Sequence, residues 1–195
     1  GTQTAGSVIR PGAFNGVVAY KGSYGWADMT GIKAYAPSLD TLGFFAREAN
    51  DLALIRAAYG HAPEDTLKAP PRIGVVELPW GELSAPYNQR NLREAARALR
   101  AAGARVRAWQ APDTWSGLLP AQHRIMTREA TRSFAGERAR FADLFSPSLQ
   151  AVMTEGDAVS AKQYADAKKR KRAALAQLEE AWQRFDLLLA PAAKG

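Results

Sequence analysis

The sequence predicts an α/β protein in which a mixed, partly parallel β-sheet is flanked by helices. Between residues 72 and 109 a strand pattern, a helical pattern, a glycine and a second strand pattern follow one another, which is the order of a βαβ unit. From residue 121 onward, apolar residues recur mostly at helical spacing. The chain has 195 residues with 47% hydrophobic content, so it can bury a sizeable core and most simply forms one domain.

The N-terminal part of the chain is rich in glycine, which indicates repeated turns or close backbone approach rather than long helices. An apolar run at 17–20 predicts a buried strand, and a second extended segment ends near Phe45. A helix is expected to begin at Asn50 or Asp51 and to end before Gly60.

Residues 61–71 are polar and contain several prolines, which is typical of a surface linker. This linker divides the chain into 1–60 and an α/β and helical portion, 72–195. We expect both to belong to the same domain.

The second portion opens with a β-rich run at 72–78. An amphipathic helix follows from Asn88 or Asn91 to Ala102, with a glycine where a C-cap belongs, and 105–109 alternates as a strand. Parallel pairing of these strands follows from the βαβ order.

The remaining sequence is mostly helical. We expect helices at 121–140, 146–154 and 160–185, and a last buried strand at 187–190.

The composition excludes several classes of site. The chain contains no cysteine, which rules out a thiol nucleophile, disulfides and thiolate metal sites and fits a cytoplasmic protein. Its apolar runs are far shorter than the roughly 20 residues that cross a bilayer, so no membrane partner is expected. The net charge of +7 and the basic run at 168–172 could suggest nucleic-acid binding, but the run falls within a helical pattern and most simply covers its solvated face.

A serine lies in a tight loop near the N-terminus, in the order Thr4, Ala5, Gly6, Ser7. Taken alone, Ser7 reads as a turn residue. Small residues before a serine can also aim successive backbone N–H groups into one space, where they stabilise the oxyanion of a tetrahedral intermediate. Ser7 is therefore the candidate nucleophile, and Thr4, Ala5 and Gly6 are the candidate oxyanion and substrate-binding residues.

The blocks GTQTAGSVIRPGAFNGVVAYKGSYG and PSLDTLGFFAR, followed by the looser stretches PRIGVVELP, IMTREATR and FDLLLAPAAKG, resemble the amidase signature family of serine amidases. The resemblance implies an amidase-signature fold, Ser7 as the nucleophile and its neighbouring backbone amides as the oxyanion hole. It also implies hydrolysis of a carboxylic amide to an acid and ammonia or an amine through an acyl-enzyme.

Four positions depart from the family pattern without removing the nucleophile. Gln3 stands where many members have Asp, Ala5 and Gly22 replace a common glycine and proline, and Arg10 stands one place late.

In the resembled family, a second serine in a cis peptide and a buried lysine activate the nucleophile, and both come from segments upstream of this loop. The chain therefore resembles an internal piece of an amidase. The nearest lysines, Lys21, Lys33 and Lys68, are weak candidates for a replacement base, and His61 and His123 lack partners at a diagnostic spacing.

Other polar and aromatic residues have simpler structural interpretations. Asp40 is expected to cap or brace the loop beneath the active site. Glu129 could line a pocket, although a solvated helix face is the simpler expectation, and Trp26, Trp80 and Trp115 could form pocket walls or packing contacts. No metal-ligand spacing or phosphate-binding loop occurs, so neither a metal nor a cofactor is expected.

The sequence thus predicts an amidase-type serine hydrolase that acts on a small-molecule amide, or an ester of the same acyl-transfer chemistry. The alternative is a catalytically incomplete module that needs a complementing chain, or a non-catalytic scaffold. We expect no nucleic-acid partner. Self-association into a homo-oligomer is expected, because an incomplete sheet would expose apolar surface.

Overall fold

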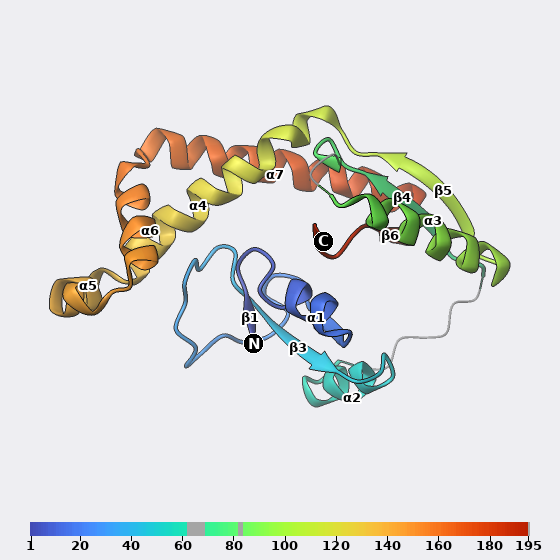
Figure 1. Ribbon diagram of the computed structural model, residues 1–195, viewed down its shortest axis with the longest axis horizontal. Helices are drawn as coiled ribbons and strands as arrows, with labels where there is room; N and C mark the ends of the chain where they lie inside the picture. The colour runs from blue at the N-terminus through green and yellow to red at the C-terminus, as the bar shows by residue number, and fades with distance from the viewer. Residues whose placement is uncertain (62–68, 82–83, 195) are drawn as a thin grey trace. The chain divides into compact units, whose positions relative to one another are not determined.

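The computed structural model describes residues 1–61, 69–81 and 84–194 (Figure 1). The chain forms two compact units. Unit 1 contains residues 1–61 and 118–171, and unit 2 contains residues 62–117 and 172–195. The expected linker at 61–71 falls mostly on residues 62–68, which lie outside the described part of the chain.

Unit 1 contains a three-stranded antiparallel sheet in the order β1-β3-β2, from β1 (Thr2–Gln3), β3 (Thr41–Ala46) and β2 (Val18–Lys21). The predicted strands at 17–20 and through Phe45 are confirmed. The first of them is half-buried rather than buried, because β2 lies at an edge of its sheet. The expected helix after Asn50 is α2 (Asp51–Ala58).

A short helix that was not predicted, α1 (Ile9–Asn15), lies within the glycine-rich segment, where turns or close backbone approach were expected. It contains Gly12, which packs directly on Ala19 of β2, so that a Cβ at this position would overlap the alanine side chain. The helix ends at Gly16, whose φ of 65° is readily adopted only by glycine. Gly12 therefore permits close packing of the helix on the sheet, and Gly16 permits the turn that ends the helix.

The helical part of unit 1 consists of α4 (Leu118–Ser133), α5 (Ala135–Phe141), η3 (Ala142–Leu144), α6 (Pro147–Ala158) and the first part of α7 (Ala161–Arg184). The prediction of one helix over 121–140 is wrong, because the chain breaks at Phe134. The Ser133 carbonyl accepts a hydrogen bond from Lys33 Nζ at 2.8 Å, and the Phe134 ring packs on Tyr35 and Phe145 at centroid distances of 6.0 and 6.3 Å. Tertiary contacts thus end α4 without a glycine or proline.

The α4 and α6 helices pack closely against each other. Gly156 of α6 faces Thr127 and Thr131 of α4 so tightly that a Cβ would overlap both residues. Met153 and Ile125 are each 1% exposed and form part of the core of this unit. Ser146 caps α6, because its Oγ accepts from Leu149 N at 3.3 Å.

Unit 2 contains a parallel sheet in the order β5-β4-β6, made of β5 (Arg105–Gln110), β4 (Arg72–Glu77) and β6 (Leu187–Leu189). The predicted βαβ unit is confirmed, with α3 (Pro86–Ala101) as its connecting helix. A short 3₁₀ helix, η2 (Asp113–Gly117), follows β5.

Helices cover both faces of this parallel sheet (Figure 1). On one face Val76 and Trp109 pack against Ala181 and Phe185 from the end of α7 and the residue that follows it. On the other face Ile73, Val75 and Val106 pack against Ala96 and Leu99 of α3. Because successive side chains of β4 point to opposite faces of the sheet, this strand contributes to both apolar clusters. The prediction of an α/β fold is confirmed.

The start of α3 differs from the prediction. The helix begins at Pro86, which suits the first helical position because its missing N–H needs no partner there. Asn88 does not cap the helix; its Nδ2 donates to the Ala193 and Lys194 carbonyls at 3.0 and 2.9 Å. The described part of the chain contains no helix that is both long enough and apolar enough to cross a membrane.

Candidate active site

The candidate nucleophile loop joins β1 to α1 within unit 1. Val8 is 0% exposed and its methyl groups pack against Gly43 of β3, whereas Ser7 is exposed. Gly6 is buried beneath the Arg10 side chain, and its carbonyl accepts from Arg10 N at 3.0 Å. The loop is therefore anchored by the residues on both sides of the serine, and the serine itself is exposed.

Gln3 closes this loop through its side chain. Its Oε1 accepts hydrogen bonds from Val8 N at 3.0 Å and Ile9 N at 2.9 Å, the two N–H groups that directly follow Ser7. These groups belong to the first turn of α1, which has no capping side chain at Val8 itself. The Gln3 side chain therefore caps the N-terminus of α1, although Gln3 lies five residues before Val8.

Thr4 is held by Asp40. The Thr4 hydroxyl donates to Asp40 Oδ1 at 2.5 Å, and Asp40 Oδ2 accepts from Tyr35 N and Ala36 N at 2.7 and 2.9 Å. Asp40 is 7% exposed, so these bonds satisfy a buried carboxylate. The expectation that Asp40 braces the loop is confirmed.

Glu129 of α4 fixes the same turn from its other side. Glu129 is 6% exposed and accepts from Ser38 N at 2.8 Å, Ser38 Oγ at 2.6 Å and the Tyr164 hydroxyl at 2.6 Å. Lys171 Nζ donates to the Ser38 carbonyl at 2.7 Å. The expectation of a solvated position for Glu129 is wrong, because the turn that contains Ser38 covers it.

The surroundings of Glu129 change the titration of its neighbours. Burial, then the hydrogen bond to Glu129, raise the pKa of Tyr164 to about 12, so its hydroxyl remains a donor at neutral pH. Burial lowers the pKa of Lys171. A continuous set of hydrogen bonds thus runs from α4 and α7 through the 35–40 turn to Thr4.

Among the described residues, the backbone N–H groups of the loop before the serine lack hydrogen-bond acceptors. In the part of the chain that the structure describes, no residue accepts a hydrogen bond from the backbone N–H of Ala5, Gly6 or Ser7. Unpaired N–H groups beside an exposed hydroxyl are the donors that an oxyanion requires.

None of the lysines or histidines considered as a base contacts Ser7 within the described residues. Lys21 Nζ donates to the Gly22 carbonyl, and burial lowers the pKa of Lys21. Lys33 pairs with Glu137 at 2.6 Å, and Lys68 lies outside the described part of the chain.

His61 stacks on Trp26 with ring centroids 4.8 Å apart, and His123 pairs with Glu155 at 2.7 Å. Trp26 and Trp115 serve packing within their own units, since Trp115 packs on Trp109 at 5.6 Å.

The basic run on α7 is only partly solvated. Lys169, Arg170 and Arg172 are exposed, as expected. Lys168 lies over the Tyr164 ring at 5.2 Å, and Lys171 approaches the Tyr24 ring at 5.6 Å. Two of the five cations therefore pack onto unit 1 instead of facing solvent.

Comparison with known proteins identifies similar sequences and folds. The family model described as Amidase matches residues 1–195. The A subunit of the glutamyl-tRNA(Gln) amidotransferase of Deinococcus deserti is 31% identical over 230 residues, which covers 98% of this chain and 47% of that protein.

A solved structure described as the crystal structure of amidase superposes with a TM-score of 0.85 at 26% identity, over 96% of this chain and 43% of that one. For 6-aminohexanoate cyclic dimer hydrolase complexed with substrate, the TM-score is 0.79 at 22% identity, over 96% and 45% of the two chains, which shows a shared fold. The chain spans less than half the length of each of these proteins.

Proposed function

Since the chain belongs to the amidase family, we propose that it carries the nucleophile of an enzyme that hydrolyses a carboxylic amide. Ser7 attacks the amide carbonyl, and the amine or ammonia leaves as an acyl-enzyme forms on its hydroxyl. Water then releases the acid. An ester of the same acyl group fits the same steps.

The exposed Ser7 hydroxyl beside unpaired backbone N–H groups carries this proposal. The N–H groups of Ala5, Gly6 and Ser7 supply the oxyanion hole, which stabilises charge that develops only during the reaction. The Thr4 hydroxyl already donates to Asp40. Thr4 therefore positions the loop through Asp40 and does not contact the substrate through its hydroxyl.

A serine hydroxyl needs a base to become nucleophilic. The described residues offer no such base for Ser7. The second candidate function is therefore a module that acts only together with a complementing polypeptide. The relative from Deinococcus deserti is named as one subunit of an amidotransferase, which supports a protein partner. We also retain the proposal that residues 1–60 and 72–195 are parts of one amidase domain.

Amide turnover distinguishes these functions. Purified chain is incubated with a panel of aliphatic and aromatic amides, and released ammonia or amine is measured for the wild type and for Ser7→Ala. The first proposal predicts turnover that Ser7→Ala abolishes. Turnover that survives this substitution would eliminate Ser7 as nucleophile, whereas Ser7-dependent turnover that requires added partner polypeptide would favour the second function.

Self-association has a separate basis in exposed apolar side chains of unit 1, where Phe14, Leu54 and Leu144 are 67%, 72% and 80% exposed. We propose that such surface is covered in the functional protein. Sedimentation equilibrium of the wild type and of Leu54→Glu measures whether a second copy of the chain covers this surface.

A further inference from the structure

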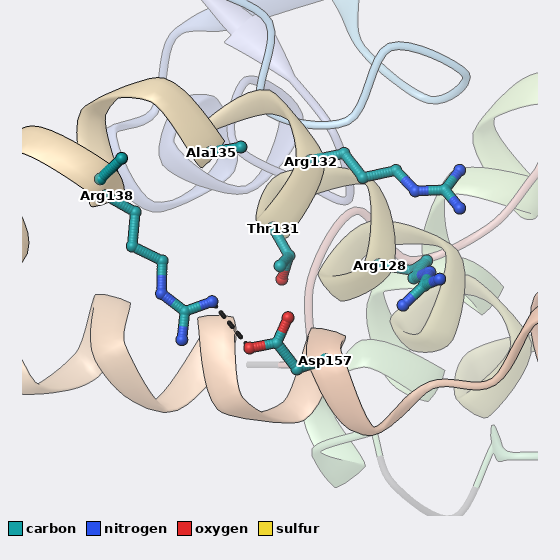
Figure 2. A pocket seen from close by; sticks show the side chains of 7 residues that line it. Arg128, Thr131, Arg132, Ala135, Arg138 and Asp157 are labelled. Carbon is teal, nitrogen blue, oxygen red and sulfur yellow. Dashed lines mark hydrogen bonds and ion pairs between the residues drawn. The ribbon is translucent and has the colours of Figure 1, made fainter.

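A pocket of about 440 Å³ lies on unit 1, away from the nucleophile loop, where α4 meets α5 and α6 (Figure 2). We call it the arginine pocket, because its lining includes Arg128, Arg132, Arg138, Thr131 and Asp157. The first two arginines and Thr131 come from α4, Arg138 comes from α5, and Asp157 comes from α6.

Positive charge exceeds negative charge in this lining. Asp157 is committed to Arg138, whose Nη1 lies 2.7 Å from Asp157 Oδ2. Figure 2 shows Arg132 extending away from that pair. Of the acids on the same helices, Glu155 pairs with His123, and Glu129 accepts hydrogen bonds from the neutral donors of Ser38 and Tyr164 rather than from either arginine.

Arg128 and Arg132 have only weak partners among the described residues. Arg128 Nη1 reaches the Gly156 carbonyl at 3.5 Å, and its Nε is buried without a hydrogen-bond partner. The Arg132 guanidinium lies 5.6 Å from the Tyr164 ring, a cation–π contact that leaves its N–H groups free for an acceptor.

This arrangement is unfavourable without a counter-charge. The two side chains stand at i and i+4 on one helix, where like charges repel. Arg132 is exposed, but the Nε of Arg128 is buried without an acceptor, and burying an unpaired donor costs free energy. An anion between them would remove both penalties, and the planar fork of N–H donors of each arginine matches the oxygens of a phosphate or a carboxylate.

We propose that the arginine pocket binds an oxyanion, a phosphate or a carboxylate group, through the guanidinium groups of Arg128 and Arg132. Asp157 competes with the ligand for Arg138 and so limits the affinity. The pocket volume corresponds to roughly 15 water molecules at about 30 Å³ each. It therefore has room for a small molecule that bears the anionic group. This site is independent of the Ser7 chemistry, and it stands whether or not the proposed amidase function does.

Isothermal titration calorimetry of the full 195-residue chain at constant ionic strength tests the site, with inorganic phosphate and succinate as separate probes and chloride as background. Binding of phosphate alone assigns a phosphoryl ligand, and binding of succinate alone assigns a dicarboxylate. Binding of neither above the chloride background overturns the proposal.

Three variants locate the binding. Arg132→Gln should weaken it at least tenfold, and because Arg132 is exposed this variant is expected to fold. Asp157→Asn should tighten binding several-fold, since it frees Arg138 and removes the competing charge. Arg124→Gln is the matched control, because Arg124 is an exposed arginine of α4 outside the pocket lining, and it should bind as the wild type does. Equal losses in Arg124→Gln and Arg132→Gln, or weaker binding in Asp157→Asn, would overturn the proposal by showing a non-specific charge effect.

Discussion

The hydrogen bonds of Gln3 make a prediction that can be measured without any substrate. Gln3→Met keeps the length of the side chain but removes the oxygen that accepts from Val8 N and Ile9 N. Each bond is worth about 0.5–1.5 kcal/mol. Because about 1.4 kcal/mol is tenfold in an equilibrium constant, hydrogen exchange of these two amides should become about two- to tenfold faster. Exchange is followed for each amide by NMR.

Two comparisons isolate the effect. Gln3→Glu retains an oxygen that can accept from both N–H groups and should restore protection. The amide of Asp186 donates to the Arg72 carbonyl at 2.8 Å in unit 2, so its exchange should not change. Wild-type exchange at Val8 and Ile9 in Gln3→Met would show that the Gln3 side chain does not protect these amides. If Ser7 is active, Gln3→Met should also lower kcat more than it changes KM, because a displaced nucleophile loses rate sharply even for a shift of about 1 Å.

Three further predictions concern stability. Glu129→Ala leaves three partly buried donors without their acceptor and should lower the free energy of unfolding by about 1–3 kcal/mol. Glu155→Ala, at an exposed pair, should change it by less than about 1 kcal/mol. Urea denaturation measures both. Gly43→Ala places a Cβ 2.8 Å from Val8 Cγ1 and should cost about 1–3 kcal/mol in the same assay, so an unchanged midpoint would show that β3 adjusts freely. The hydrogen bonds from Arg72 lower the pKa of Asp186 from 3.8 to about 2. The Asp186 carboxylate therefore stabilises the fold above pH 3.8, and this contribution is lost as the pH falls toward 2. Asp186→Asn should flatten the pH dependence of the unfolding midpoint between these two pH values.

Elements with a strong local pattern could be predicted from the sequence. The alternation of β4, the amphipathic face of α3 and the alternation of β5 are each contained within a single segment, and all three elements formed, with α3 beginning earlier than expected. The amidase family was also predicted, from the blocks around Ser7. The short helix α1 was missed because Pro11 and Gly12 both disfavour a helix interior, and only packing on β2 makes the glycine useful.

Other features depend on contacts between segments that are distant in the sequence. Glu129 lies on the same face of α4 as Ala121 and Ile125, four positions after Ile125, but a carboxylate at that position gave no sign of what would cover it; the turn that contains Ser38, 91 positions earlier, buries it. The break at Phe134 similarly depends on Lys33 and Tyr35. The roles of Thr4, Ala5, Gly6 and Ser7 stay a prediction. The closure of their loop by Gln3 is a local contact, but it depends on a side-chain conformation that the sequence pattern does not specify.

The role proposed for the Ser7 hydroxyl, a nucleophile served by this loop, can be tested by covalent labelling. The folded chain is treated with a serine-reactive fluorophosphonate, and any adduct is located by peptide mass spectrometry. We expect one adduct, on the peptide that contains Ser7, and none in Ser7→Ala, while the half-buried Ser38, whose Oγ donates to Glu129, remains unmodified. Absence of an adduct in demonstrably folded protein, or an adduct that persists in Ser7→Ala, would contradict a nucleophilic role for Ser7.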